Sequence, residues 1–150
     1  MKIDINDREC LPDFIRLNEL WITAHFSIED ADRALALSPG KVIDDGGFVF
    51  SLKVDDRVVG VCALFKESAT RYQLARMAVE PALRGRGYGH MLMEYVLETA
   101  KSAGAESIYL MSNTALQAAI SLYERFGFVV ISRGQHPVYA RCNIVLERQL

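Results

Sequence analysis

Residues 74–101 constrain the fold more than any other part of the chain, because they predict a strand, a glycine-rich turn and a helix in succession. Residues 74–79 are apolar except for one charge, and Glu80-Pro81 ends this run. From Tyr88 onward, apolar residues recur at the spacing of one helical face, at positions 91, 92, 95, 96, 100 and 103. The stretch therefore predicts a strand-turn-helix unit.

The turn of this unit is a candidate anion site. It reads Arg84-Gly85-Arg86-Gly87-Tyr88-Gly89, with three glycines in five residues. Glycine has no Cβ to keep a ligand away from the backbone, and the first turn of a helix has N–H groups without a helical partner. Arg84 and Arg86 add positive charge, which favours a diphosphate over a carboxylate, although both could be solvated surface charges. We expect the diphosphate to bind the backbone N–H groups of residues 86 to 90, the last of which is that of His90.

A dinucleotide fold, a P-loop and a plain tight turn can also contain several glycines, but each fits this turn poorly. The spacing is GxGxG rather than GxGxxG, and no GK[ST] is present. A turn without a ligand rarely needs three glycines and two arginines. The pattern therefore favours phosphate binding of a different kind.

Length and composition limit the remaining possibilities. We expect residues 1–150 to form one domain, and a composition that is 51% hydrophobic and 24% charged argues against disorder. A net charge of −2 gives no general attraction to nucleic acid or to acidic membranes. No signal peptide or membrane-spanning run is apparent, so we expect a soluble, cytoplasmic protein. Neither the three cysteines nor the three histidines have metal-site spacing, so we predict no metal site and buried free thiols.

The other elements predict an α/β domain with helices on a mixed sheet. We expect strands at 2–6, 48–54, 58–65, 72–79, 107–112, 128–132 and 138–146. We expect helices at 11–26, 28–37, 88–103 and 116–126, the second and fourth capped by Ser27 and Thr114. The strand at 107–112 follows a helical crossover, which predicts parallel pairing with the strand before it.

The succession of strand, RxxGxG turn and helix, followed by a strand and a helix with AIxLYxxxGF at residues 119–128, resembles the GNAT superfamily of acetyl-coenzyme A dependent N-acetyltransferases. The tail at 139–144 is similar to a functionally uncharacterised branch of it. The resemblance implies a mostly antiparallel sheet of about seven strands with four helices and a V-shaped split between the fourth and fifth strands. It also implies acetyl-coenzyme A as cosubstrate, with the pantetheine arm bonded to the backbone of Met77, Ala78 and Val79, and no metal.

The resemblance assigns roles to two further residues. Acetyl transfer to an amine leaves a thiolate, and Tyr123 matches the family residue whose phenol donates its proton or a hydrogen bond to that sulfur. Tyr123 could also be a core aromatic, since it shares a helical face with Leu116. Position 116 is where relatives carry the Asn that holds pantetheine, so Asn113 is a possible substitute, unless it only serves its turn.

The general base is not evident, because Gln73 stands where many relatives carry Glu. Glu29, Asp30, Glu67 or His136 could act directly or through water, and we favour Glu29, which lies between the first two helices. Deprotonating an amine of pKa about 10.4 at pH 7 costs about 4.6 kcal/mol, against about 1.4 kcal/mol for an α-amino group near 8. A missing base therefore favours acceptors of low pKa.

Other residues could line an acceptor pocket. Arg141 could hold a substrate carboxylate or face solvent from a last strand. Several aromatic residues suit either the pocket or the core, with the core preferred: Trp21, Phe26, Phe48, Tyr72 and Tyr139.

The sequence as a whole predicts transfer of an acetyl group from acetyl-coenzyme A to a primary amine of a small molecule, by direct attack in a ternary complex. Two alternatives remain open. One is an acetyl-coenzyme A sensor without turnover, and the other is a protein or peptide N-acetyltransferase. Because many superfamily members are dimers, a homodimer is also an option.

Overall fold

A seven-stranded sheet with the order β1-β2-β3-β4-β5-β7-β6 is the centre of the computed structural model, which describes residues 1–150. Its strands are β1 (Lys2–Ile5), β2 (Phe48–Val54), β3 (Arg57–Lys66), β4 (Arg71–Val79), β5 (Ser107–Ser112), β6 (Val129–Arg133) and β7 (Ile144–Gln149). Only β4 and β5 pair in parallel, and all other neighbours are antiparallel. The predicted mixed, mostly antiparallel sheet is confirmed.

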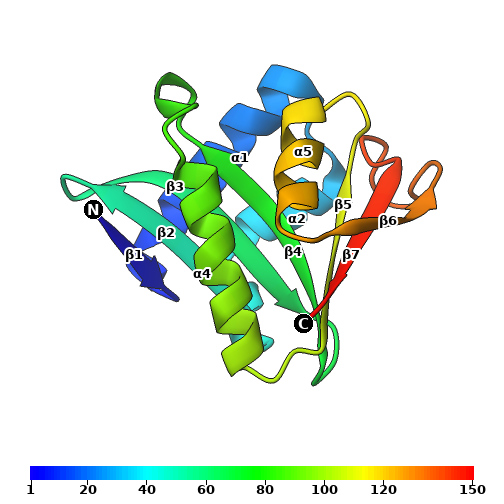
Figure 1. Ribbon diagram of the computed structural model, residues 1–150. Helices are drawn as coiled ribbons and strands as arrows, with labels where there is room; N and C mark the ends of the chain where they lie inside the picture. The colour runs from blue at the N-terminus through cyan, green and yellow to red at the C-terminus, as the bar shows by residue number, and fades with distance from the viewer.

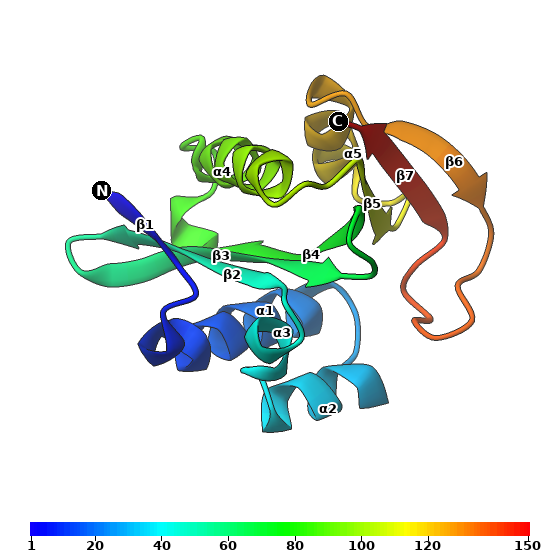
Figure 2. The same ribbon diagram turned by 90° about the horizontal axis from the view of Figure 1, so that it is seen from below.

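Helices cover both faces of this sheet. They are α1 (Leu11–His25), α2 (Asp30–Leu37), α3 (Lys41–Asp44), α4 (Tyr88–Ser102) and α5 (Gln117–Arg125). Figure 2 shows α4 and α5 on one face and α1, α2 and α3 on the other. Alternate residues of β2 point to opposite faces, so Phe50 and Leu52 pack under α4 while Val49 packs under α1. None of the helices is long and apolar enough to cross a lipid bilayer.

The sheet splits between β4 and β5. These strands pair only at Arg71↔Ser107, Tyr72↔Ile108 and Gln73↔Tyr109. Beyond Gln73, β4 continues beside β3 to Val79, while β5 continues beside β7 to Ser112. Figure 1 shows the two strands diverging from their shared end. The V-shaped split between the fourth and fifth strands is therefore confirmed.

A bulge in β4 lies within the split. Three residues of β3, from Val61 to Ala63, face four of β4, from Ala75 to Ala78, and Arg76 has a φ of 63°. A non-glycine residue with this φ needs support from its surroundings. Asn18 gives part of that support, since its buried side-chain amide donates to the Arg76 carbonyl at 3.2 Å.

Three sequence predictions were wrong in detail. Helix α2 begins at Asp30 with Glu29 as its N-cap instead of Ser27, and the Glu29 N–H donates to Asp32 Oδ2 at 2.9 Å. Helix α5 begins at Gln117 without a side-chain cap, because Thr114 belongs to the preceding turn. The short helix α3 is a fifth helix where four were predicted, since a four-residue helix leaves no periodicity to detect.

The last strand begins at Ile144, not at residue 138. Residues 134–143, which we call the 134–143 segment, are irregular because their polar groups bond within the segment. Gln135 donates to the carbonyls of Tyr139 and Ala140 at 3.2 and 2.8 Å, and the Cys142 N–H donates to the Tyr139 carbonyl at 3.1 Å. The segment therefore lies beside the split instead of extending β7.

Candidate active site

A cavity of about 420 Å³ passes through the split, lined by 27 residues of which 18 are hydrophobic. At one end, which we call the turn end, it reaches Arg84, Gly85 and Gly89 and the α5 side chains. At the other, which we call the α1 end, it reaches Trp21 and Phe26 together with the 134–143 segment. Because α5 and α1 lie on opposite faces of the sheet (Figure 2), the cavity connects the two faces.

The turn end carries a row of free backbone donors. None of the N–H groups of residues 86 to 90 donates to another backbone group, and the first helical bond there is from Met91 to the Gly87 carbonyl at 3.1 Å. Gly85 and Gly87 have φ values of 79° and 82°, which glycine adopts without strain. A Cβ added at either would meet nothing within 4 Å, so their role is conformational. The N–H groups that an anion would need are therefore free, and anion binding at this turn stays a prediction.

The third glycine and the charged residues of the turn differ in role. A Cβ at Gly89 would lie 3.6 Å from Leu122 Cδ2, an ordinary van der Waals contact, so the packing of α4 against α5 does not require this glycine. Arg84 lines the cavity, whereas Arg86 is exposed and outside the lining. The His90 side chain faces away, with Nε2 2.9 Å from Glu94 Oε1.

The middle of the cavity is lined by Met77, Ala78 and Val79. Because β5 has already separated, the edge of β4 opposite β3 has no strand partner here. Backbone groups on this edge are available for a ligand with amide groups.

Tyr123 of α5 lines the same cavity. Burial raises the pKa of its phenol, and the nearby Cys62 thiol raises it further. The edge of its ring packs against Phe128, with 6.2 Å between ring centroids. The phenol therefore keeps its proton at neutral pH and can act as a donor.

Asn113 also lines the cavity, but its side-chain amide already has partners. Its Nδ2 donates to the Arg141 carbonyl at 2.9 Å, and its Oδ1 accepts from the Ala115 N–H at 2.8 Å. These bonds match the turn role that the sequence left open. The coenzyme contact of Asn113 stays a prediction.

A buried charge cluster forms the wall at the α1 end. Arg141 binds Asp32 through two bonds of 2.6 and 2.7 Å, and Arg76 binds the same carboxylate and donates to the Tyr139 hydroxyl at 2.7 Å. The Asp32 side chain is only 3% exposed. Burial acts to raise the pKa of Asp32, but bonds from Arg141 and the Glu29 backbone and the charge of Arg76 lower it to about 2. Arg141 is therefore paired and does not face solvent.

Glu29 belongs to the same cluster. Its carboxylate accepts from the Ala140 N–H at 2.9 Å and from Arg141 at 3.2 Å, and it is not among the residues that line the cavity. As general base it would act only after releasing these partners or through another group. This role of Glu29 stays a prediction.

Sequence reasoning missed several residues of this end. In the sequence, Asp32 resembles an ordinary acidic residue in the first turn of a helix, and Arg76 resembles a single charge in an apolar strand. Asn18 and Phe65 belong to no recognisable motif. Of the aromatic candidates, Trp21, Phe26 and Tyr139 line the cavity, contrary to the preferred core assignment. The other two, Phe48 and Tyr72, pack against each other in the core with centroids 6.2 Å apart.

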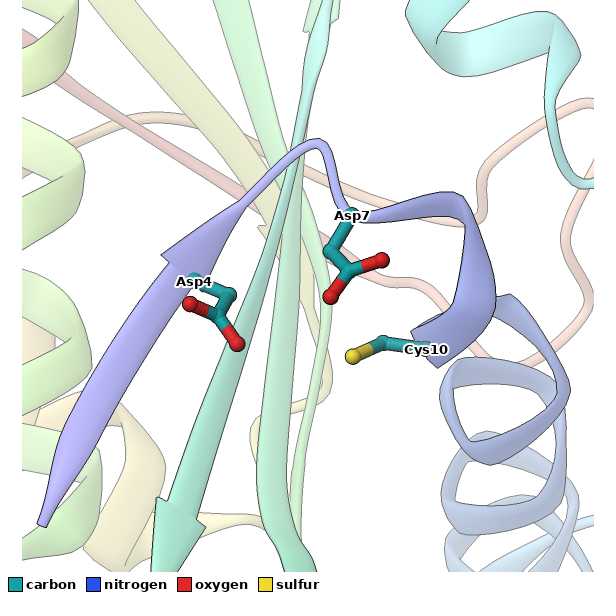
Figure 3. A group of neighbouring side chains, drawn as sticks. All are labelled: Asp4, Asp7 and Cys10. Carbon is teal, nitrogen blue, oxygen red and sulfur yellow. The ribbon is translucent and has the colours of Figure 1, made fainter. Parts of the chain in front are cut away.

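One group of side chains elsewhere combines metal-ligand types. Asp4, Asp7 and Cys10 lie together beside the first strand (Figure 3). Lys53 supplies their positive charge, with its Nζ 2.9 Å from Asp4 and 3.8 Å from Asp7. We interpret the group as a structural ion pair that joins β1 to β2. All three cysteines are buried and unbridged, which confirms the free-thiol prediction.

Fold and cavity together define a class of α/β domains whose sheet splits beside a glycine-rich helix start. The model of the acetyltransferase (GNAT) family matches residues 12–128, and the chain therefore belongs to this family.

The individual relatives match only part of the chain or match it at low sequence identity. The chain is 31% identical over 90 residues to the [ribosomal protein bS18]-alanine N-acetyltransferase of Salmonella typhimurium, a match that covers 57% of this chain and 59% of that protein. Among solved structures, a GNAT-family acetyltransferase from Staphylococcus aureus superposes with a TM-score of 0.85 at 21% identity, covering 99% of both chains. An aminoglycoside 6'-N-acetyltransferase complexed with coenzyme A superposes with a TM-score of 0.78 at 16% identity, covering 99% of this chain and 97% of the other. These two likenesses show the fold.

Proposed function

We propose that the protein transfers an acetyl group from acetyl-coenzyme A to a primary amine of a small molecule, by direct attack in a ternary complex. The observation that carries the proposal is the continuous cavity. It extends from the glycine-rich turn with its free N–H groups, past Tyr123 in its wall, to Trp21 and Phe26 at the α1 end. Two substrates that enter from opposite faces would meet beside Tyr123.

The coenzyme would occupy the turn end. The N–H groups of residues 86 to 90 have no backbone acceptor and would bind the pyrophosphate, and Arg84 adds a charge at the cavity. The free edge of β4 at Met77, Ala78 and Val79 offers donors and acceptors to the pantetheine amides. This arrangement would hold the thioester close to Tyr123.

Tyr123 would act on the leaving sulfur. When the amine nitrogen bonds to the acetyl carbon, the carbon–sulfur bond breaks and the sulfur takes the electron pair. A thiol has a pKa of about 8.5, below that of a phenol, so complete transfer of the Tyr123 proton to the thiolate is uphill. We therefore assign Tyr123 a hydrogen bond that stabilises the developing thiolate. The proton that the amine nitrogen loses on becoming an amide balances the one that the thiolate takes up, so the phenol keeps or regains its own.

Tyr123→Phe tests this role. We expect kcat to fall on the order of 100-fold, while the Kd for acetyl-coenzyme A stays within about twofold. Tyr95→Phe is the matched control, because Tyr95 is 43% exposed on α4. Stopped-flow detection of released coenzyme A measures kcat, and titration calorimetry measures Kd. An unchanged kcat in Tyr123→Phe would overturn the assignment.

Glu29→Gln tests the proposed base. If Glu29 accepts the proton of the amine, kcat/KM falls in the variant and the remaining acidic limb follows the titration of the amine alone. A profile of unchanged shape means that the base lies elsewhere or that the amine arrives uncharged. Circular dichroism melting checks that the loss of the Arg141 contact leaves the fold intact.

A second candidate is acetylation of a protein or peptide amine. It is favoured by the similarity to the [ribosomal protein bS18]-alanine N-acetyltransferase, whose matched region spans 59% of that relative. A third is a sensor that binds acetyl-coenzyme A without turnover. Coenzyme A release with amines, amino acids, polyamines and peptides separates the three, since a sensor would bind acetyl-coenzyme A and release none.

Location and assembly are also part of the proposal. We expect the protein in the cytoplasm, because three unbridged buried cysteines suit a reducing compartment. We expect a homodimer through β6, an edge strand on which Val129 and Ile131 are 62% and 50% exposed. Light scattering of the purified chain, compared with Ile131→Lys, measures the assembly.

A further inference from the structure

The charges that face the cavity are all of one sign. Its lining includes Arg76, Arg84 and Arg141 and contains no aspartate or glutamate. Gln73, at the apex of the split, is also uncharged. An amine that arrives as an ammonium ion therefore meets no carboxylate in the lining.

The carboxylates nearest to the α1 end already have partners. Asp32 is bound by Arg76 and Arg141, and its side chain is 3% exposed. Glu29 is held by Arg141 and by the Ala140 N–H. These contacts leave the acids behind the arginines, so neither is free to neutralise a ligand.

A neighbouring cavity of about 320 Å³ has the same character. Phe65, Arg76 and Tyr139 line both cavities and separate them. The second contains one carboxylate, Asp45, which pairs with Lys41 at 2.8 Å, and it adds the cation Lys66. An acceptor that extended into this space would again meet an excess of positive charge.

Aromatic rings do not compensate for the missing carboxylates. A ring face can attract a cation, but the Tyr139 ring is already covered by the guanidinium carbons of Arg141 at 4.7 Å and Arg76 at 5.5 Å. Trp21 and Phe26 pack against each other with centroids 5.9 Å apart, and together with Phe65 they offer apolar surface to a ligand body.

We infer that the acceptor is a monoamine of low pKa with an aromatic or apolar body, which enters the α1 end uncharged, and that polycations are excluded. This inference rests on the proposed acetyl transfer. At pH 7 about a tenth of an amine of pKa 8 is uncharged, against about one part in 2,500 for an amine of pKa 10.4, a ratio of about 200. A second ammonium group would also lose its hydration in a lining that offers it no free carboxylate, which adds to this ratio. Aminoglycosides carry several ammonium groups, so they fall outside the class.

A pair of acceptors that differ only in charge tests the inference. Phenylalanine amide is an aromatic monoamine with a low α-amino pKa, and its para-aminomethyl derivative adds one ammonium group to the same body. With acetyl-coenzyme A saturating, we expect kcat/KM for the first to exceed that for the second by at least about 30-fold, and to exceed that for spermidine by at least about 200-fold. Equal or faster transfer to the derivative or to spermidine would overturn the acceptor class while acetyl transfer itself stood.

A variant adds the missing charge. Gln73→Glu changes one lining amide to a carboxylate of almost the same shape, and we expect it to reduce the preference for phenylalanine amide at least tenfold. Gln117→Glu is the control, because Gln117 is exposed and outside the lining. An unchanged preference in Gln73→Glu contradicts an electrostatic origin.

A binding measurement distinguishes an error in the acceptor class from an error in the proposed acetyl transfer. Trp21 is the only tryptophan and lines the cavity, so its fluorescence reports ligands at the α1 end. In protein loaded with coenzyme A, we expect phenylalanine amide to quench it and spermidine to have no effect at the same concentration. Quenching without any turnover would reject acetyl transfer and keep the ligand class, whereas quenching by spermidine would reject the class.

Discussion

The turn end and the α1 end of the cavity draw their residues from very different distances along the chain. The turn end comes from consecutive residues, 84–90, in which Gly85 and Gly87 have open space where a side chain would be. The α1 end depends on Asp32, which bonds to Arg76 44 residues away and to Arg141 109 residues away. A local backbone conformation forms the turn end, and buried tertiary contacts form the α1 end. Changes at the turn end should therefore affect ligand affinity, and changes at the α1 end should affect stability.

Asp32→Ala should have the largest effect. It leaves two arginines without their buried counter-charge, and removal of one partner from such a cluster costs about 3–5 kcal/mol of unfolding free energy. Chemical denaturation measures the loss. Asp30→Ala on the same helix is the control, since Asp30 pairs only with Arg33 at the surface and should change stability by less than about 1 kcal/mol. Similar losses in both variants would mean that the cluster has no special role.

Gly87→Ala should reduce stability less than Asp32→Ala does, and its main effect should be weaker ligand binding. A Cβ at a φ of 82° costs about 1 kcal/mol, and rearrangement of the turn should weaken binding of acetyl-coenzyme A about tenfold. Gly104→Ala is a close control, because Gly104 has a φ of 88° and equally open space but lies at the other end of α4. Both variants should lose similar stability, and only Gly87→Ala should lose affinity. Equal affinities by calorimetry would contradict a ligand role for the turn.

The smallest predicted effect is that of pH, because the contribution of Asp32 to stability changes only in acid, below the physiological range. The pKa of Asp32 is lowered in the folded protein, from 3.8 to about 2. Its contribution to stability is therefore fully present above the unfolded pKa and is lost as pH falls toward 2. We expect the stability difference between the protein and Asp32→Asn to be constant from pH 5 to 8 and to shrink below about pH 4. A difference that changed between pH 6 and 7 would point to another titrating group.

The same contrast explains which predictions succeeded. The glycine-rich turn follows from a pattern of neighbouring residues, whereas the split sheet and Tyr123 in the cavity wall followed from the family resemblance that two such patterns carry. The structure has the split and the free N–H groups. The cluster at the α1 end was not predicted, because Asp32 and Arg76 have the spacing of ordinary surface or strand residues. The 134–143 segment was mistaken for strand, since alternation at 138–146 does not reveal the internal bonds of Gln135.

By itself the sequence determined the order of most elements, the glycine-rich turn before α4 and, through two motifs, the membership of a family, because periodicity and glycine conformation are local properties. Only the tertiary structure decided what faces the acceptor. The positions of Asp32, Arg76 and Arg141 depend on where α2, β4 and the 134–143 segment meet. A buried charge is stable only when it is paired with an opposite charge. In this fold Arg76 and Arg141 line the cavity, and Asp32, the carboxylate that pairs with both, does not.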